Sequence, residues 1–205
     1  MRLILASKSP ARKETLRRAG LRPEIIVSGI DEDAVTADKP SDLAQVLAQL
    51  KAESVMERLA ITAPTALIAC DSVLEFNGQV HGKPGTAEAA ISHWYRIRGQ
   101  RGVLHTGHFV AVWDEVGAPR TMNRLASTVV TFADLTDAEI AAYAATGEPQ
   151  RVAGGFTTDG YGGAFVTSMQ GDPHNVVGIS LPLVRQMLLD LGVPWQTLWA
   201  KVALD

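Results

Sequence analysis

The sequence has one cysteine and no long apolar run, and each scarcity excludes a class of protein. Because Cys70 is the single cysteine among 205 residues, neither an intrachain disulfide framework nor a cysteine-rich zinc site can form. No stretch approaches the roughly 18–20 apolar residues that cross a bilayer, and the N-terminus lacks the apolar core of a secretion signal. We therefore expect a reducing, cytoplasmic location and no membrane partner.

The sequence also lacks a large excess of either positive or negative charge. The formal net charge is −3, and the charged (20%) and hydrophobic (46%) contents are those of a soluble globular protein. No nucleic-acid partner is therefore expected, and any phosphate binding must be local. The chain lacks repeats, low-complexity tracts and flexible linkers, so we expect a single domain over residues 1–205.

The N-terminal stretch is the first candidate for a binding site. An apolar run, Leu3 to Ala6, predicts a buried strand, and Ser9 and Pro10 are typical of the N-cap and first residue of a helix that ends at Gly20. Hydroxyls, basic side chains and free N–H groups would then meet at the positive end of a helix dipole, which suits a phosphate. An ordinary capped strand–helix junction is the alternative.

A second candidate follows the apolar run 66–70, which predicts a buried strand ending at Asp71. A carboxylate at the carboxyl end of a central strand lies where open α/β sheets bind ligands, although such residues also cap turns. Glu32 or Asp31, in an acidic loop, would be hard oxygen ligands for a divalent cation or parts of a solvated turn. Cys70 would point the other way, as a small core residue.

Two lysines are less distinctive. Lys51 lies beside the apolar stripe of a helix expected after Asp42 and up to about Leu59, a position typical of a surface lysine. Lys83 follows a predicted β-hairpin that turns at Asn77-Gly78, where it can reach a phosphate over the sheet edge or stay solvated.

The rest of the chain predicts further helices and strands. These are a helix from Thr86 to before Gly99, strands at 103–112 and 122–132, a helix opened by the capping box Thr136–Glu139, a short strand at 164–166, a loop over 171–175 and a last helix opening at 179–182. His105 and His108 would lie on opposite faces of a strand, poorly placed to share a metal. The glycine-rich stretch 152–163 predicts a close approach of backbone to a nucleotide, or else a tight connection.

Seven short motifs follow one another along the chain. They are Leu-Ala-Ser-x-Ser-Pro-x-Arg at residues 5–12, Asp31-Glu32, Asp71 after its strand, Gly82-Lys83-Pro84, His105-Thr106-Gly107, Gly147-Glu148-Pro149 before Ala153-Gly154, and Gly171-Asp172 with Asn175-Val176-Val177-Gly178. Each motif alone is weak, but the ordered set resembles the Maf family of nucleoside triphosphate pyrophosphatases along nearly the whole chain.

The resemblance implies an α/β fold: a mixed twisted sheet flanked by helices, with two interleaved lobes around a deep cleft, similar to the inosine triphosphate pyrophosphatases. It also implies hydrolysis of a nucleoside triphosphate to the monophosphate and pyrophosphate with a divalent metal, Mg²⁺ or Mn²⁺, held by Asp71 and Glu32. Asp71 would be the catalytic base, and Glu32 and Lys83 would assist it. The resemblance places Ser7, Arg12 and Lys51 as substrate-binding residues, and a homodimer is left open.

Three positions depart from the family pattern. Ala11 replaces the usual first arginine after Ser-Pro, Ser72 replaces a threonine that often follows the catalytic aspartate, and Asp159 replaces a glutamine. These positions are tied to base choice in family members, and together they fit neither the dTTP/UTP branch nor, cleanly, the 7-methyl-GTP branch. The preferred base, canonical or modified, is therefore left open.

Two other function classes also stay open. A nucleotide-binding regulator of cell division would bind without turnover, and a plain phosphate-ester hydrolase would release orthophosphate. The combination of Asp71, Glu32 and Lys83 favours the pyrophosphatase, because a binding protein needs no carboxylate to activate water.

Overall fold

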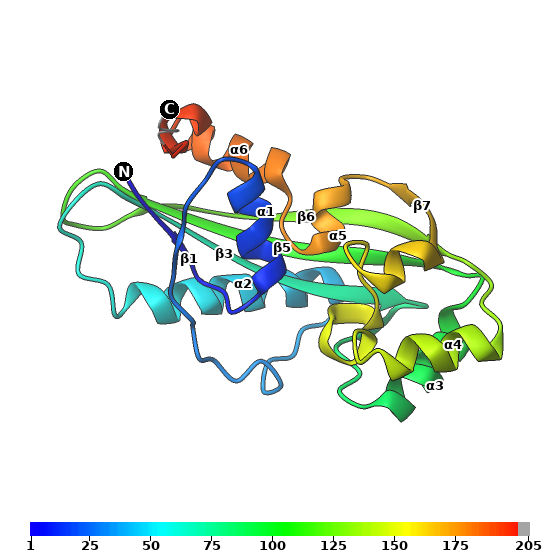
Figure 1. Cartoon of the computed structure of the whole chain (residues 1–205). Coiled ribbons are helices and arrows are strands. Elements are labelled where there is room, and N and C mark those ends of the chain that lie inside the picture. The colour runs from blue at the N-terminus through cyan, green and yellow to red at the C-terminus, as the bar shows by residue number, and fades with distance from the viewer. Residues whose placement is uncertain (201–205) are drawn as a thin grey trace.

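A computed structural model describes residues 1–200 and shows a seven-stranded mixed sheet flanked by helices (Figure 1). The strands are β1 (Arg2–Leu5), β2 (Glu24–Ile25), β3 (Thr65–Phe76), β4 (Gln79–His81), β5 (Arg101–Trp113), β6 (Arg120–Phe132) and β7 (Val166–Gln170). Their order is β2-β1-β3-β5-β6-β7, with β4 paired to β3. Because β1 pairs in parallel with β2 and β3 while the other pairs are antiparallel, the expected mixed α/β sheet is confirmed.

The helices pack on the sheet through three apolar clusters. They are α1 (Pro10–Arg18), α2 (Pro40–Met56), α3 (Ala87–Ile97), α4 (Asp137–Ala145), α5 (Pro173–Val177) and α6 (Leu181–Asp190). Helices α1 and α6 cover the face that carries Ile68, whereas α2 covers the face that carries Leu67. Helices α3 and α4 enclose a separate cluster around Trp94. The first and last helices thus build one half and the middle of the chain the other, so the two halves are interleaved. Within residues 1–200 no helix is both long and apolar enough to span a membrane.

The first strand and helix form as the sequence predicts. The Ser9 hydroxyl accepts the backbone N–H of Arg12 at 3.4 Å, and Leu16 is fully buried under the helix. The chain leaves the helix through Gly20, whose φ of +85° is a left-handed conformation that favours glycine.

Strand β3 is longer than predicted, and this changes the setting of Asp71. The strand continues to Phe76, so Asp71 lies within it rather than at its end. On one edge β5 pairs with β3 from Thr65 to Glu75. On the other edge β1 pairs only as far as Ile68, and β4 begins at Leu74. No strand among the described residues pairs with this edge between residues 69 and 73, which we call the β3 notch.

Two predictions near the C-terminal end are wrong. Most of the expected strand 164–166 belongs to a 3-10 helical turn, Tyr161–Phe165, and β7 begins at Val166. The expected loop 171–175 contains the start of α5, because Asp172 accepts the backbone N–H of His174 at 3.0 Å and caps a helix.

Earlier in the chain, helix α2 ends at Met56, before the expected end near Leu59. The hairpin at Asn77-Gly78 and the capping box at 136–139 are confirmed.

Candidate active site

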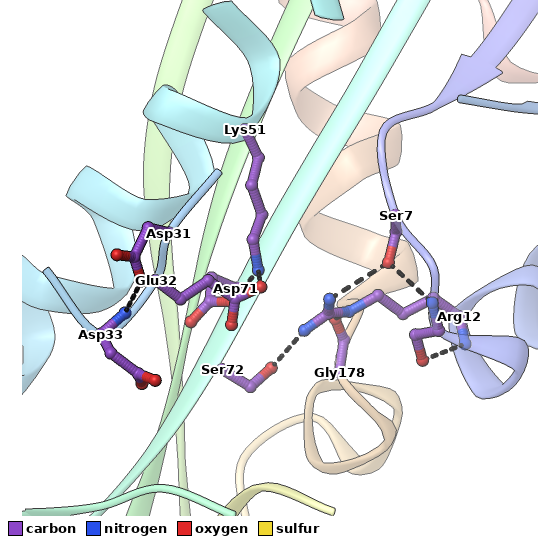
Figure 2. Close-up of polar contacts among 10 residues, drawn as sticks. Ser7, Arg12, Asp31, Glu32, Asp33, Lys51, Asp71, Ser72 and Gly178 are labelled. Atoms are coloured by element: carbon purple, nitrogen blue, oxygen red, sulfur yellow. Dashed lines mark hydrogen bonds and ion pairs between the residues drawn. The ribbon is translucent and has the colours of Figure 1, made fainter. Parts of the chain in front are cut away.

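The β3 notch brings two polar side chains to opposite faces of the sheet. Successive strand residues alternate between faces, so Asp71 points toward α2 and Ser72 toward α1. Figure 2 shows the two groups of contacts on either side of the strand. Within residues 1–200 no strand pairs with this edge, so both groups lie beside the same unpaired stretch of β3.

Asp71 and Glu32 share one buried lysine. The Lys51 side chain is 7% exposed, and its Nζ lies 2.9 Å from Glu32 Oε1 and also contacts a carboxylate oxygen of Asp71. Burial acts to raise the pKa of Glu32, but the hydrogen bond and charge of Lys51, with the charges of Lys83 and Lys8, leave that pKa below its usual value. Glu32 is therefore an ionised carboxylate in a cationic surrounding.

The interpretation of Lys51 as a surface residue is wrong. Helix α2 turns its small residues to the sheet, and its buried positions are Ala44, Leu47, Ala48, Lys51, Ala52 and Val55. This packing is close because β5 presents Gly107, where a Cβ would lie 2.2 Å from the backbone oxygen of Ala44. The sequence analysis placed Lys51 beside the buried face of this helix, whereas the structure places it within that face, among the alanines.

Arg12 ties the loop after β1 to two other segments. Its Nε donates to the Gly178 carbonyl at 2.7 Å, its Nη1 to Ser7 Oγ at 3.3 Å, and its Nη2 to Ser72 Oγ at 3.0 Å. Ser7 Oγ also accepts the backbone N–H of Ser9 at 3.2 Å. Gly178 has a φ of +111°, and a Cβ there would lie 3.0 Å from Arg12 Nε, so a larger residue would displace the guanidinium.

Thr106 and Asn175 extend this group, and the sequence reasoning assigned them no role. Thr106 is fully buried, and its Oγ1 lies 2.9 Å from Ser72 Oγ and 3.3 Å from the Asn175 carbonyl. A carbonyl oxygen only accepts, so Thr106 donates to Asn175 and accepts from Ser72. The Ser72 hydroxyl is thereby oriented with its lone pairs toward Arg12. Both residues lie in recognised motifs, but only the three-dimensional contact shows what they do.

Lys83 and Asp31 lie in loops, as predicted. Lys83 is exposed between β4 and α3, and its charge lowers the pKa of Glu32. The Asp31 carboxylate accepts the backbone N–H of Asp33 at 3.2 Å and so organises its own loop. Cys70 is fully buried in the core, and burial raises the pKa of its thiol to about 12, which confirms the interpretation of Cys70 as a core residue.

The three positions tied to base choice fall into two groups. Asp159 is exposed and lines a cavity of about 350 Å³ against α1 and α5. Ala11 lies one helical turn before Thr15, which lines the same cavity and donates from its hydroxyl to the Ala11 carbonyl at 3.0 Å. Ser72 lies instead in the Arg12 group.

The glycine-rich stretch packs against the protein's own side chains. The Gly154 and Gly155 carbonyls bond to His93 Nε2 (2.8 Å) and Trp94 Nε1 (2.9 Å) on α3. Farther along, the Glu148 carboxylate accepts the backbone N–H groups of residues 161 and 162 at 3.0 and 2.8 Å. The tight connection is thus the better description, and Glu148 and His93 are anchors that the sequence reasoning did not identify.

Within residues 1–200 no group of three or more His, Cys, Asp or Glu side chains is placed to hold a metal ion. His108 Nε2 accepts the backbone N–H of Ser180 at 2.8 Å, whereas His105 contacts other strands. The two carboxylates that converge at the notch are Glu32 and Asp71, which both contact Lys51 Nζ.

The sequence matches a known family over most of its length. The family described as Maf-like protein matches residues 2–191. A protein of Cutibacterium acnes named nucleoside triphosphate pyrophosphatase is 54% identical over 200 residues, which cover 96% of this chain and 93% of the relative. A protein of the same name from Salinispora tropica is 51% identical over 203 residues, covering 98% and 88%. The solved structure of the Staphylococcus aureus Ham1 protein aligns with 65% of this chain and 73% of its own, at 16% identity and a TM-score of 0.40.

Proposed function

The chain belongs to the Maf-like protein family, and from this membership we propose that it hydrolyses a nucleoside triphosphate to the monophosphate and pyrophosphate. The observation that carries the proposal is a buried carboxylate in contact with a buried ammonium, Asp71 with Lys51, in the same notch as Arg12. Relatives named nucleoside triphosphate pyrophosphatase align with 96% and 98% of the chain, which supports the same activity.

In the proposed reaction, Asp71 accepts a proton from the water that attacks the α-phosphorus. Asp71 is suited to this role because it is only 6% exposed and its carboxylate is held in place by Lys51. Cleavage between the α- and β-phosphates leaves negative charge on the departing pyrophosphate. Lys51, Lys83 and Arg12 are the cations that would offset this charge.

The donor set at the notch fits a hard divalent cation, Mg²⁺ or Mn²⁺. Glu32 and Asp71 both contact Lys51 Nζ, so the two carboxylates lie side by side. Two carboxylates are enough, because Mg²⁺ is bound in proteins by one or two carboxylates together with substrate phosphates and waters. When bound, such a cation would supply positive charge at the triphosphate. We assign Glu32 and Asp71 as the residues that would hold it.

The direct test is a panel of canonical and modified nucleoside triphosphates incubated with the full chain and Mg²⁺ or Mn²⁺. The expected products are the monophosphate and pyrophosphate, separated and identified by ion-exchange chromatography. Release of orthophosphate would instead indicate a phosphate-ester hydrolase, and binding without any product would indicate a regulator. Full activity after exhaustive chelation would contradict the metal assignment.

For the base, we propose that Asp159 contributes to substrate choice. Its carboxylate lines the cavity beside α1, near the turn that starts at Ala11. An ionised carboxylate accepts hydrogen bonds and donates none, so it favours a base edge with N–H donors, as guanine has. The short side chain of Ala11 leaves space at the same helix for a purine or a modified base.

A further inference from the structure

Outside the notch, side chains from three neighbouring strands are linked by hydrogen bonds. The strand register places Val73 of β3, His105 of β5 and Ser127 of β6 side by side. Glu75 lies two residues beyond Val73 and so on the same face of β3. Ser127 Oγ is 2.8 Å from His105 Nδ1, and His105 Nε2 is 2.8 Å from Glu75 Oε2.

The direction of each hydrogen bond follows from the chemistry of the three groups. An ionised Glu75 carboxylate only accepts, so the neutral His105 ring must carry its proton on Nε2. The Nδ1 atom then holds a lone pair, and Ser127 must donate its hydroxyl proton to it. The result is a hydroxyl bonded to a base, and a base oriented by a carboxylate.

The base, the carboxylate and the hydroxyl differ in how far their residues are exposed. His105 is 8% exposed, the Glu75 side chain is 32% exposed, and Ser127 is an exposed residue. The base is therefore shielded from water, while the serine that bonds to it is an exposed residue. Glu75 lies four residues along β3 from Asp71, about 14 Å at the rise of an extended strand, so the cluster is separate from the notch.

We propose that Ser127 is an activated serine that forms a covalent adduct with acyl esters and with the phosphonyl fluorides that mimic them. A hydroxyl next to a base that is held by a third group is the arrangement that activates serine as a nucleophile. With an ester, the Oγ–carbonyl bond forms and the bond to the alcohol oxygen breaks; with a phosphonyl fluoride, the Oγ–phosphorus bond forms, the P–F bond breaks and fluoride leaves. The hydroxyl proton passes to His105 Nδ1 and then to the departing alcohol, while Glu75 stabilises the charged ring. Both formation and hydrolysis of an acyl adduct develop an oxyanion, and the three residues include no donor for it, so the proposal is limited to adducts with reagents that carry a good leaving group.

The test is labelling of the full chain with a biotinylated fluorophosphonate, followed by mapping of the modified peptide. Ser168 is a matched control, because it is also an exposed serine, and its Oγ donates to Thr131 Oγ1 at 3.1 Å instead of to a base. We expect Ser127 to be labelled about 10²-fold faster than Ser168, the low end of what a general base contributes. The Ser127→Ala variant should lose the label, and the His105→Gln variant should fall to the rate of Ser168.

Folding is checked on each variant by its melting temperature. Glu75→Gln, nearly isosteric, is the milder variant and should reduce the labelling rate while the protein stays folded. Hydrolysis of a nucleoside triphosphate should be unchanged in Ser127→Ala, which separates this proposal from the one at the notch. Equal labelling of Ser127 and Ser168, or labelling of Ser127 that persists in folded His105→Gln, would overturn the proposal. A fall in melting temperature with no labelling of the wild type would also overturn it and leave a purely structural network.

Discussion

At position 71 a carboxylate and an amide have nearly the same shape, but only the carboxylate can take a proton from water. We expect Asp71→Asn to lower kcat about 10²–10⁴-fold, the usual contribution of a general base. The protein should stay folded because the amide oxygen can still accept from Lys51, whose charge remains paired with Glu32. Asp38→Asn, at an exposed position outside the site, is the control and should keep wild-type kcat. Near wild-type turnover in Asp71→Asn would rule out Asp71 as the base.

The residue that tests base choice is Asp159. We expect Asp159→Gln to change the ratio of kcat/KM values for guanine and pyrimidine triphosphates, because a carboxylate only accepts hydrogen bonds whereas an amide both donates and accepts them. Steady-state kinetics with both substrates on wild type and variant measure it. Asp38→Gln, another exposed acid, should leave the ratio unchanged. An unchanged ratio in Asp159→Gln would mean that Asp159 is a solvated turn residue.

Single residues were predictable from the sequence where the chemistry is local. Ser9 and Pro10 are typical of a helix start, and Asp71 directly follows an apolar run. Both features can therefore be recognised from neighbouring residues in the sequence. Lys51 does not, because its burial depends on how closely α2 approaches β5. Thr106 acquires its role only when Ser72 is brought beside it by the β3–β5 pairing.

Strand β3 shows the same limit for a whole element. The polar pair Asp71-Ser72 interrupts the apolar run and suggests an end, yet the strand continues because β5 supplies partners from Thr65 to Glu75. The notch arises from the opposite edge, where β1 is short. Neither fact can be read from β3 itself, since strand pairing joins residues far apart in the chain.

The packing of α2 on β5 yields a prediction about an element contact. A Cβ at Gly107 would lie 2.2 Å from the backbone oxygen of Ala44, so Gly107→Ala must push α2 away from the sheet. Overpacking of this kind costs typically 1–3 kcal/mol, and Lys51 should move away from Asp71 with the helix. We expect a lower free energy of unfolding in urea and a lower kcat.

The matched control is Gly82→Ala. A Cβ at Gly82 would meet nothing within 4 Å and its φ is not in the left-handed region, so both unfolding and turnover should stay near wild type. Wild-type stability in Gly107→Ala would show that α2 and β5 have more room than the contact indicates.

At the scale of the whole molecule, two buried histidines predict how stability depends on pH. Burial lowers the pKa of His93 and of His108 from 6.5 to about 4. Between these values the unfolded chain binds protons that the native protein does not, so stability falls as the pH falls from 6.5 toward 4. Each histidine contributes a slope of at most about 1.4 kcal/mol per pH unit. Urea unfolding at a series of pH values measures the slope.

His108 makes this prediction specific. Its Nε2 accepts the backbone N–H of Ser180, so a proton on Nε2 would break the contact that holds the start of α6. The His108→Gln variant should show a shallower fall between pH 6.5 and 4.5, whatever its absolute stability. An identical slope in wild type and variant would place the proton uptake elsewhere.

The buried thiol of Cys70 simplifies fluorescent labelling of the protein in solution. A thiol with a pKa of about 12 and no exposed surface is nearly unreactive toward maleimides at neutral pH. Since it is the single cysteine of the sequence, a cysteine introduced on the surface becomes the one site that accepts a fluorophore. Two cysteines introduced at exposed Val46 of α2 and exposed Tyr161 would carry a pair of dyes and report by energy transfer whether the distance between these positions changes when nucleotide binds. The native background needs no replacement for that experiment.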